Sequence, residues 1–131
     1  MLLSSVAILL SVFVILPELV IAQEPRNNVV CNVFDVTKLS IVSRPTGAID
    51  VLGVISNNNS TLTYEGVGLV GEFYDSNDSL IGVETGSAEF GTLRPGDRSP
   101  FKIKTDISNQ TLDHYTITCR SSEGRASYQL P

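Results

Sequence analysis

The 131-residue chain contains a single His, two Cys, one Met and no Trp. A blue-copper centre needs two His and a Cys, so this chain cannot build one alone. No Cys-x-x-Cys or His–Cys spacing typical of a zinc site occurs. A catalytic triad would have to use His114, which we expect at an exposed strand start and which no nucleophile motif accompanies. The sequence therefore predicts no resident metal, no other cofactor and no enzymatic activity.

Positive charge is also scarce, since 9 Lys and Arg stand against 14 Asp and Glu and give a formal net charge of −5. A general nucleic-acid binder needs a positive field, so nucleic acid is not expected as a partner. Hydrophobic residues make up 42% of the chain and charged residues 18%, which is typical of a folded chain rather than a disordered one. At this length a single domain is expected.

The one long apolar run lies at the N-terminus, in residues 2–21, and is followed by Ala22 as a small-residue cleavage position. Residues 1–22 are therefore predicted to be a helical export signal. An uncleaved membrane anchor is the alternative, because a helix over residues 2–22 could cross a bilayer of about 30 Å. In both cases the remainder is expected to be secreted or to lie on the extracytoplasmic face of the membrane.

The rest of the chain lacks helical spacing and has turn signals every 8 to 14 residues. A polar leader covers residues 23–28. The pattern then predicts strands at 29–36, 48–56, 62–74, 80–84, 101–107 and 114–120, with shorter ones at 39–42, 88–93 and 126–130. About seven short strands with such turns predict an all-β fold, an antiparallel β-sandwich over residues 29–131.

Alternation along these strands predicts which side chains face the core. Phe73 and Phe101 each lie on the apolar side of an alternating strand, so we expect both in one core. The opposite faces carry charged residues and are expected to face water: Asp50, Glu65, Glu72, Lys102 and Lys104.

Cys31 lies near the start of the predicted domain and Cys119 near its end. Two thiols in an exported chain are expected to pair as a disulfide. The alternative is a pair of separately buried thiols, which behave as small apolar side chains.

Asn-x-Ser/Thr tripeptides occur in predicted turns at four positions: Asn58, Asn59, Asn77 and Asn109. In an exported eukaryotic or archaeal chain they would be candidate glycosylation sites, whereas in a bacterium they would be chance matches. Asn58 and Asn59 are adjacent, so steric crowding disfavours modification of both.

The segment 48–103 carries a series of turn and packing motifs. These are Gly53-Val54-Ile55-Ser56-Asn57, Tyr74-Asp75, the apolar strand at 80–83, and Leu93-Arg94-Pro95-Gly96 before Phe101. The series resembles the FxLYD family of small exported β-sandwich domains of archaea and bacteria. The naming motif is altered here, because Gly71 replaces its first Phe and Phe73 its Leu. The resemblance implies an immunoglobulin-like sandwich, often tethered to an envelope, without catalytic residues.

Residues 66–71 match the pattern G-x-G-x-x-G. A dinucleotide site needs a helix after that loop, so that the helix N-terminus meets the pyrophosphate. Here a predicted strand end and turn follow. The glycines are therefore expected to permit a bulge or a close approach within a sheet.

Oxygen donors gather around the turn after Tyr74: Asp75, Asn77, Asp78 and Glu84. In a calcium-binding loop that starts at Asp75, the sixth position would be Gly and the twelfth Glu, but the chain has Leu80 and Gly86 there. A solvated hairpin turn is expected instead of a metal site.

The only basic concentration comprises Arg94, Arg98, Lys102 and Lys104. It could contact a glycan, an acidic protein or lipid headgroups, or the lysines could simply protect a strand edge from aggregation. The sequence thus predicts a non-catalytic cell-surface or envelope module with a structural role or a protein or glycan partner. The alternative is an accessory subunit of an envelope complex, tethered through residues 2–22.

Overall fold

The computed structural model describes residues 27–126, which form an all-β fold. The predicted N-terminal helix, the segment 1–22 and most of the leader lie outside the described residues. Within them the strands are β1 (Asn28–Val30), β2 (Phe34–Ser43), β3 (Ala48–Asn57), β4 (Leu62–Thr63), β5 (Gly68–Tyr74), β6 (Leu80–Ala88), β7 (Arg98–Ser108), β8 (His114–Arg120) and β9 (Arg125–Ala126).

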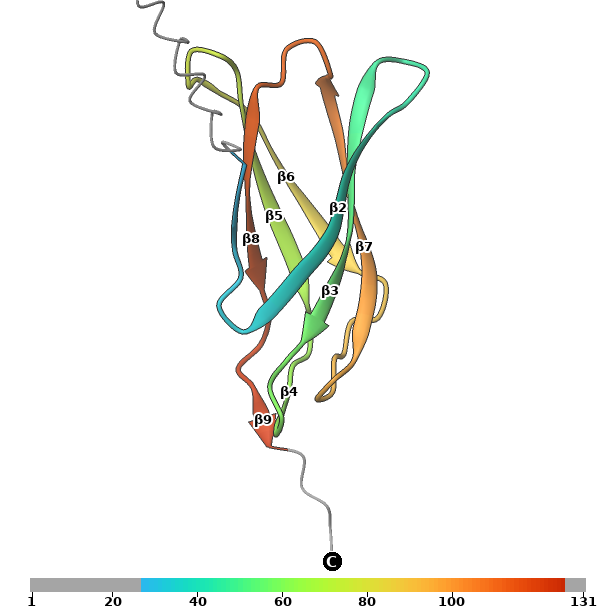
Figure 1. Ribbon diagram of the computed structural model, residues 1–131, viewed down its shortest axis with the longest axis vertical. Coiled ribbons are helices and arrows are strands. Elements are labelled where there is room, and N and C mark those ends of the chain that lie inside the picture. Colours follow the sequence, from blue (N-terminus) through green and yellow to red (C-terminus); the bar gives the residue numbers. More distant parts are fainter. Residues whose placement is uncertain (1–26, 127–131) are drawn as a thin grey trace, which may run out of the picture.

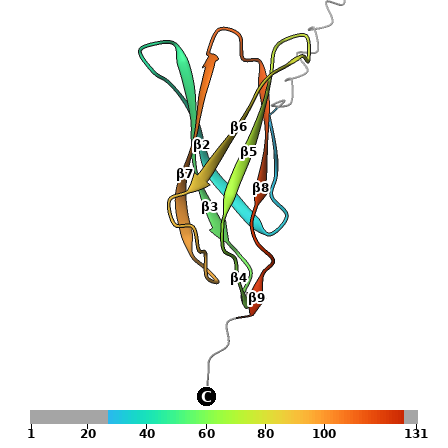
Figure 2. The same ribbon diagram turned by 180° about the vertical axis from the view of Figure 1, so that it is seen from behind.

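Seven strands form one sheet in the order β1-β8-β5-β6-β7-β3-β2, and β4 pairs with β9. β1 runs parallel to β8, whereas the other neighbours are antiparallel. β6 pairs with β5 along its length but meets β7 only at Ser87 and Ala88. The sheet bends at this short contact, so that β2, β3 and β7 face β5, β6 and β8 across a core (Figures 1 and 2).

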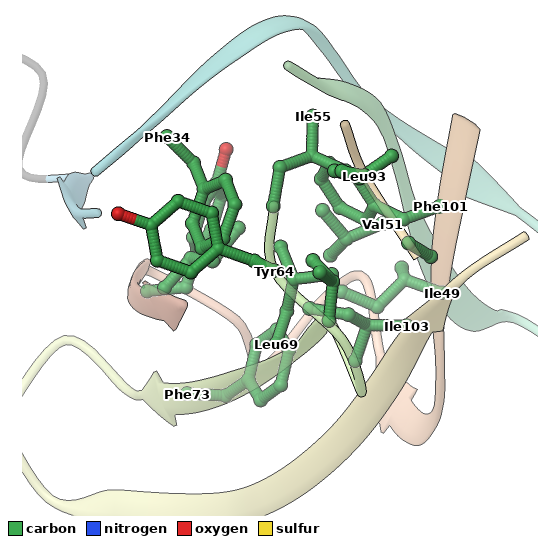
Figure 3. Close-up of a cluster of buried hydrophobic side chains, with 14 residues drawn as sticks. Phe34, Ile49, Val51, Ile55, Tyr64, Leu69, Phe73, Leu93, Phe101 and Ile103 are labelled. Atoms are coloured by element: carbon green, nitrogen blue, oxygen red, sulfur yellow. The ribbon is translucent and has the colours of Figure 1, made fainter. Parts of the chain in front are cut away.

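Phe73 on β5 and Phe101 on β7 belong to one buried cluster, as predicted, and they are 0% and 4% exposed. Figure 3 shows them among aliphatic side chains from both halves of the sheet, including Val51 on β3 and Leu69 on β5. The burial pattern along β7 alternates residue by residue, which is what a half-buried strand requires.

Gly53 shows how closely side chains within one half of the sheet pack over the backbone of a neighbouring strand. It is paired with Phe101 across β3 and β7, and the Phe101 ring lies over it. A Cβ atom at Gly53 would come within 2.6 Å of Phe101 Cζ and 3.2 Å of Leu39 Cδ2. The glycine is therefore needed for space and not for its backbone freedom.

Replacing Gly53 by Ala is expected to destabilise the fold by about 1–3 kcal/mol, because the buried Phe101 ring must shift to admit the methyl group. Denaturant unfolding measures this change. Gly91→Ala is the matched control, since a Cβ atom there meets nothing within 4 Å. Equal denaturation midpoints for Gly53→Ala and Gly91→Ala would contradict this expectation, because they would show that the Phe101 ring shifts without any loss of stability.

The predicted disulfide between Cys31 and Cys119 is present, with the Cα atoms 4.9 Å apart. Cys31 belongs to the turn between β1 and β2, and Cys119 lies on β8. The predicted continuous strand over 29–36 was wrong, because the chain turns at 31–33 to leave β8 and join β3. The disulfide therefore links the β1–β2 turn to β8, the strand with which β1 is paired.

Other predicted boundaries were also wrong. The predicted strand over 62–74 is broken between β4 and β5, where Gly66 adopts a positive φ of 60° that glycine tolerates. The predicted strands over 80–84 and 88–93 are replaced by one strand, β6, and a loop over 89–97. Gly82 and Gly86 of β6 pair with Phe73 and Leu69 of β5, and glycines lack the side-chain alternation from which a strand is predicted.

Asp50 does not face water as predicted, although Lys102 and Lys104 do. Arg44, in the turn before β3, folds back so that its Nε lies 3.3 Å from Asp50 Oδ1. The same guanidinium donates a hydrogen bond to the carbonyl of Thr105 on β7. A buried carboxylate needs a positively charged partner. The partner of Asp50 is Arg44, which lies in the turn before β3 and not on β3 itself.

Candidate interaction site

The loop over residues 89–97 is fastened to the core by Asn57 at the end of β3. Asn57 is fully buried, and its Nδ2 donates to the carbonyls of Leu62 (2.8 Å) and Leu93 (3.0 Å). Its backbone N–H donates to Asp97, and its carbonyl accepts from Gly96, both at 2.9 Å. The sequence predicts a turn at Asn57, but it does not predict that this residue links the end of β3 to β4 and to the 89–97 loop.

Replacing Asn57 by Ala is expected to destabilise the protein by about 1–3 kcal/mol, because it removes the two hydrogen bonds from Nδ2 to the carbonyls of Leu62 and Leu93. Thermal or denaturant unfolding measures the loss. Asn77→Ala removes the same side chain from an exposed turn and should stay within about 0.5 kcal/mol of the wild type. If the two variants were equally stable, Asn57 would not fasten the loop.

Further hydrogen bonds fix the conformation of the loop. Buried Leu93 exchanges backbone hydrogen bonds with Tyr64 at 2.8 and 3.0 Å. The Asp97 carboxylate accepts from the Arg94 N–H at 2.9 Å, which closes the predicted turn around Pro95 and Gly96. Gly96 has a φ of 83°, as the third position of a type II turn requires. The loop thus holds its exposed side chains on a fixed backbone.

The four predicted basic residues do not form one patch. Arg94 and Arg98 line a surface hollow of about 350 Å³, which we call the basic hollow; its lining residues are Phe90, Thr92, Leu93, Arg94, Asp97 and Arg98. Lys102 lines a separate hollow of about 240 Å³ with Glu89 and Pro100, and Lys104 is exposed further along β7. The structure therefore places Arg94 and Arg98 beside the ring of Phe90. The sequence predicts Phe90 on a strand over 88–93, whereas it lies in a loop.

His114 starts β8 as predicted, but its side chain is only 13% exposed. The ring stacks on Tyr74 with the centroids 4.9 Å apart and the planes at 8°. Its Nδ1 lies 2.8 Å from Asp113 Oδ2 and its Nε2 lies 3.2 Å from Asp78 Oδ1. The expected exposure was wrong, because the β5–β8 register sets Tyr74 opposite His114 and a single sequence does not show register.

The hydroxyl of Tyr74 donates a 2.6 Å hydrogen bond to Glu72 Oε2. This bond, with desolvation and the charge of Glu72, raises the pKa of Tyr74 above its usual 10.0. The phenol should therefore stay protonated to a higher pH than a free tyrosine. Glu72→Gln should lower the midpoint of Tyr74 in an NMR-monitored alkaline titration, whereas exposed Glu89→Gln should leave it unchanged. Equal midpoints in all three proteins would contradict this cause.

The oxygen donors around residues 75–79 form a hairpin turn, as expected. Asp75 Oδ1 accepts the backbone N–H groups of Asn77 (2.9 Å) and Ser79 (3.0 Å). Asp78 turns toward His114, and Glu84 lies on β6 opposite Gly71. Within residues 27–126, no three His, Cys, Asp or Glu side chains are grouped so that they could hold a metal ion.

Of the glycines in the G-x-G-x-x-G pattern, Gly66 lies in the loop before β5, Gly68 starts the strand and Gly71 lies within it, and β5 continues into the hairpin rather than into a helix. A Cβ atom at Gly68 would lie 3.1 Å from the carbonyl oxygen of Gly86, and one at Gly71 would lie 2.8 Å from the Phe73 ring. This agrees with the expectation that the glycines permit close approach within the sheet.

The four sequons lie at opposite ends of the molecule. Asn77 and Asn109 are exposed in the β5–β6 and β7–β8 turns, at the end where β1 begins (Figure 1). Asn58 is exposed at the other end and donates to Asp35. Asn59 is half-buried, and its Oδ1 accepts the N–H groups of Thr61 and Leu62 at 2.9 and 2.8 Å. Glycosylation of these residues stays a prediction.

No family model matches the chain, and neither a curated protein nor a solved structure is significantly similar to it. The resemblance to FxLYD domains therefore stays a prediction. In the described range 27–126 there is no helix with the length and apolar character needed to span a membrane.

Proposed function

We propose that the chain is a non-catalytic, exported β-sandwich module of the cell surface or envelope, with an interaction or structural role. The observation that carries the proposal is the Cys31–Cys119 disulfide, which spans 88 residues. Such bonds form and persist in oxidising compartments outside the cytoplasm. The apolar segment that precedes the domain is the expected means of export.

The opposite positions of β1 and the 89–97 loop support a role in which the domain presents this loop to a partner. β1 begins at the end that carries the 75–79 turn, whereas the 89–97 loop lies at the opposite end (Figures 1 and 2). A domain held through the chain before β1 would point this loop away from its attachment. The bent two-sided sheet is compatible with the immunoglobulin-like sandwich that the FxLYD resemblance implies.

The second candidate is a membrane-anchored accessory subunit of an envelope complex, held through residues 2–22. The two candidates differ in one measurable property, which is the mass of the mature chain. Cell fractionation followed by intact-mass measurement of the full chain, expressed in an export-competent host, separates them. We expect an extracytoplasmic protein that lacks residues 1–22. An intact chain in the membrane fraction would favour the anchored subunit, and a chain confined to the cytoplasm would overturn both candidates.

A further inference from the structure

Phe90 is the most exposed of the large hydrophobic side chains in the described part of the chain, at 57%. It belongs to the 89–97 loop, and its N–H donates to Ser99 Oγ at 2.8 Å. The ring contributes little to the core at this exposure, so packing does not account for an aromatic residue here. Its backbone is nevertheless held by this hydrogen bond, and its ring forms an apolar wall of the basic hollow.

Two cations share the basic hollow with this ring. Arg94 and Arg98 are both exposed, and neither guanidinium forms an ion pair with another residue between positions 27 and 126. Asp97 supplies the one carboxylate of the lining, and it already accepts the Arg94 N–H. The lining thus carries a local excess of positive charge, although the whole chain has a net charge of −5.

The geometry points to a binding site for an acidic sugar, specifically a uronate ring of an anionic polysaccharide. Such a ring has a flat C–H face that can pack on Phe90 and a carboxylate that guanidinium groups can bind through paired hydrogen bonds. A volume of about 350 Å³ lies at the small end of ligand-binding pockets. This inference rests on the proposed exported interaction module and names the class of ligand.

The rigidity of the loop favours binding of a small ligand. Asn57, Leu93 and Asp97 fix the backbone on both sides of the basic hollow before any ligand arrives. A preformed wall loses little conformational freedom on binding, so a few contacts can give measurable affinity. An acidic peptide would satisfy the arginines, but its carboxylates carry no flat apolar face to match Phe90.

The test is calorimetric titration of the full chain, purified as it accumulates in the host, with three probes. The probes are tri-galacturonate, neutral maltotriose and tri-glutamate. We expect tri-galacturonate to bind at least tenfold more tightly than either of the others. No binding of tri-galacturonate, or equal binding of tri-glutamate, would overturn the inference, and the second result would indicate a surface for acidic proteins.

Variants then assign the binding to the basic hollow. Phe90→Ala and Arg98→Gln should each weaken tri-galacturonate binding at least tenfold, whereas Lys104→Gln, the same loss of charge away from the hollow, should change it less than twofold. Thermal unfolding of each variant confirms that it is folded. Unchanged affinity in Phe90→Ala would overturn the stacking. Failure of this binding with the chain still exported would refute the ligand alone, whereas cytoplasmic retention would refute the proposed function.

Discussion

Phe73→Ala is expected to lower the free energy of unfolding by about 3–5 kcal/mol. Phe73 is fully buried between the two halves of the sheet, and its ring centroid lies 6.2 Å from that of Tyr115. The ring also covers Gly71 on its own strand. Truncation to Ala therefore removes buried apolar surface and leaves a cavity. Because β5 is paired with β8 on one side and β6 on the other, the strand cannot shift to fill this cavity. Urea unfolding followed by circular dichroism gives the change directly.

Phe90→Ala is the matched control, because it removes the same atoms from an exposed loop. We expect this variant to lose less than about 1 kcal/mol, since surface substitutions seldom cost more. A similar loss for the two variants would mean that Phe90 packs in solution, and it would contradict the core as described. A loss below 1 kcal/mol at Phe73 would contradict its burial.

Replacement of both Cys31 and Cys119 by Ser should destabilise the protein by about 4–5 kcal/mol. The bond closes a loop of 88 residues, and the chain-entropy estimate for such a loop falls in this range. Because a domain of this size has a total stability of about 5–15 kcal/mol, the double variant should unfold at a much lower denaturant concentration. Denaturant melts with and without a reductant measure the effect.

Reduction of the wild-type protein provides the control. It should reproduce most of the loss of the double variant, whereas the double variant itself should not respond to the reductant. An identical midpoint for the oxidised and reduced wild type would show that the bond does not constrain the unfolded chain. Either single Ser variant should behave like the double variant, since each leaves one thiol without a partner.

The sequence predicts well those strands that alternate in polarity. β8 was predicted with its observed bounds, because Tyr115, Ile117 and Cys119 fall on one face. β3 was predicted to within one residue, because turn residues bound its β-favouring run. The errors occur where pairing overrides composition. The turn at 31–33 interrupts a β-favouring run, and the glycine-containing β6 extends past the end that was predicted for it.

The candidate site was harder to predict than the strands. Arg94 and Arg98 stood out as charges, but Phe90 was assigned to a strand and its exposure was not foreseen. The hollow exists because Asn57 fastens the 89–97 loop across 36 residues of sequence, from its side chain to Leu93. The same limit applies to His114 and Asp50, whose partners come from neighbouring strands or from a turn. Long-range strand pairing decided the contacts of Asn57 and of His114 with Tyr74, whereas Asp50 is reached from the adjacent turn.

The central claim, an exported domain closed by one disulfide, is tested most directly by non-reducing peptide mapping. Intact cells that express the full chain are treated with a thiol-alkylating reagent, and the recovered protein is digested with trypsin. We predict a single cross-linked product of fragments 27–38 and 105–120, which carry Cys31 and Cys119. Separate fragments with both thiols alkylated, recovered from natively folded protein, would contradict the account.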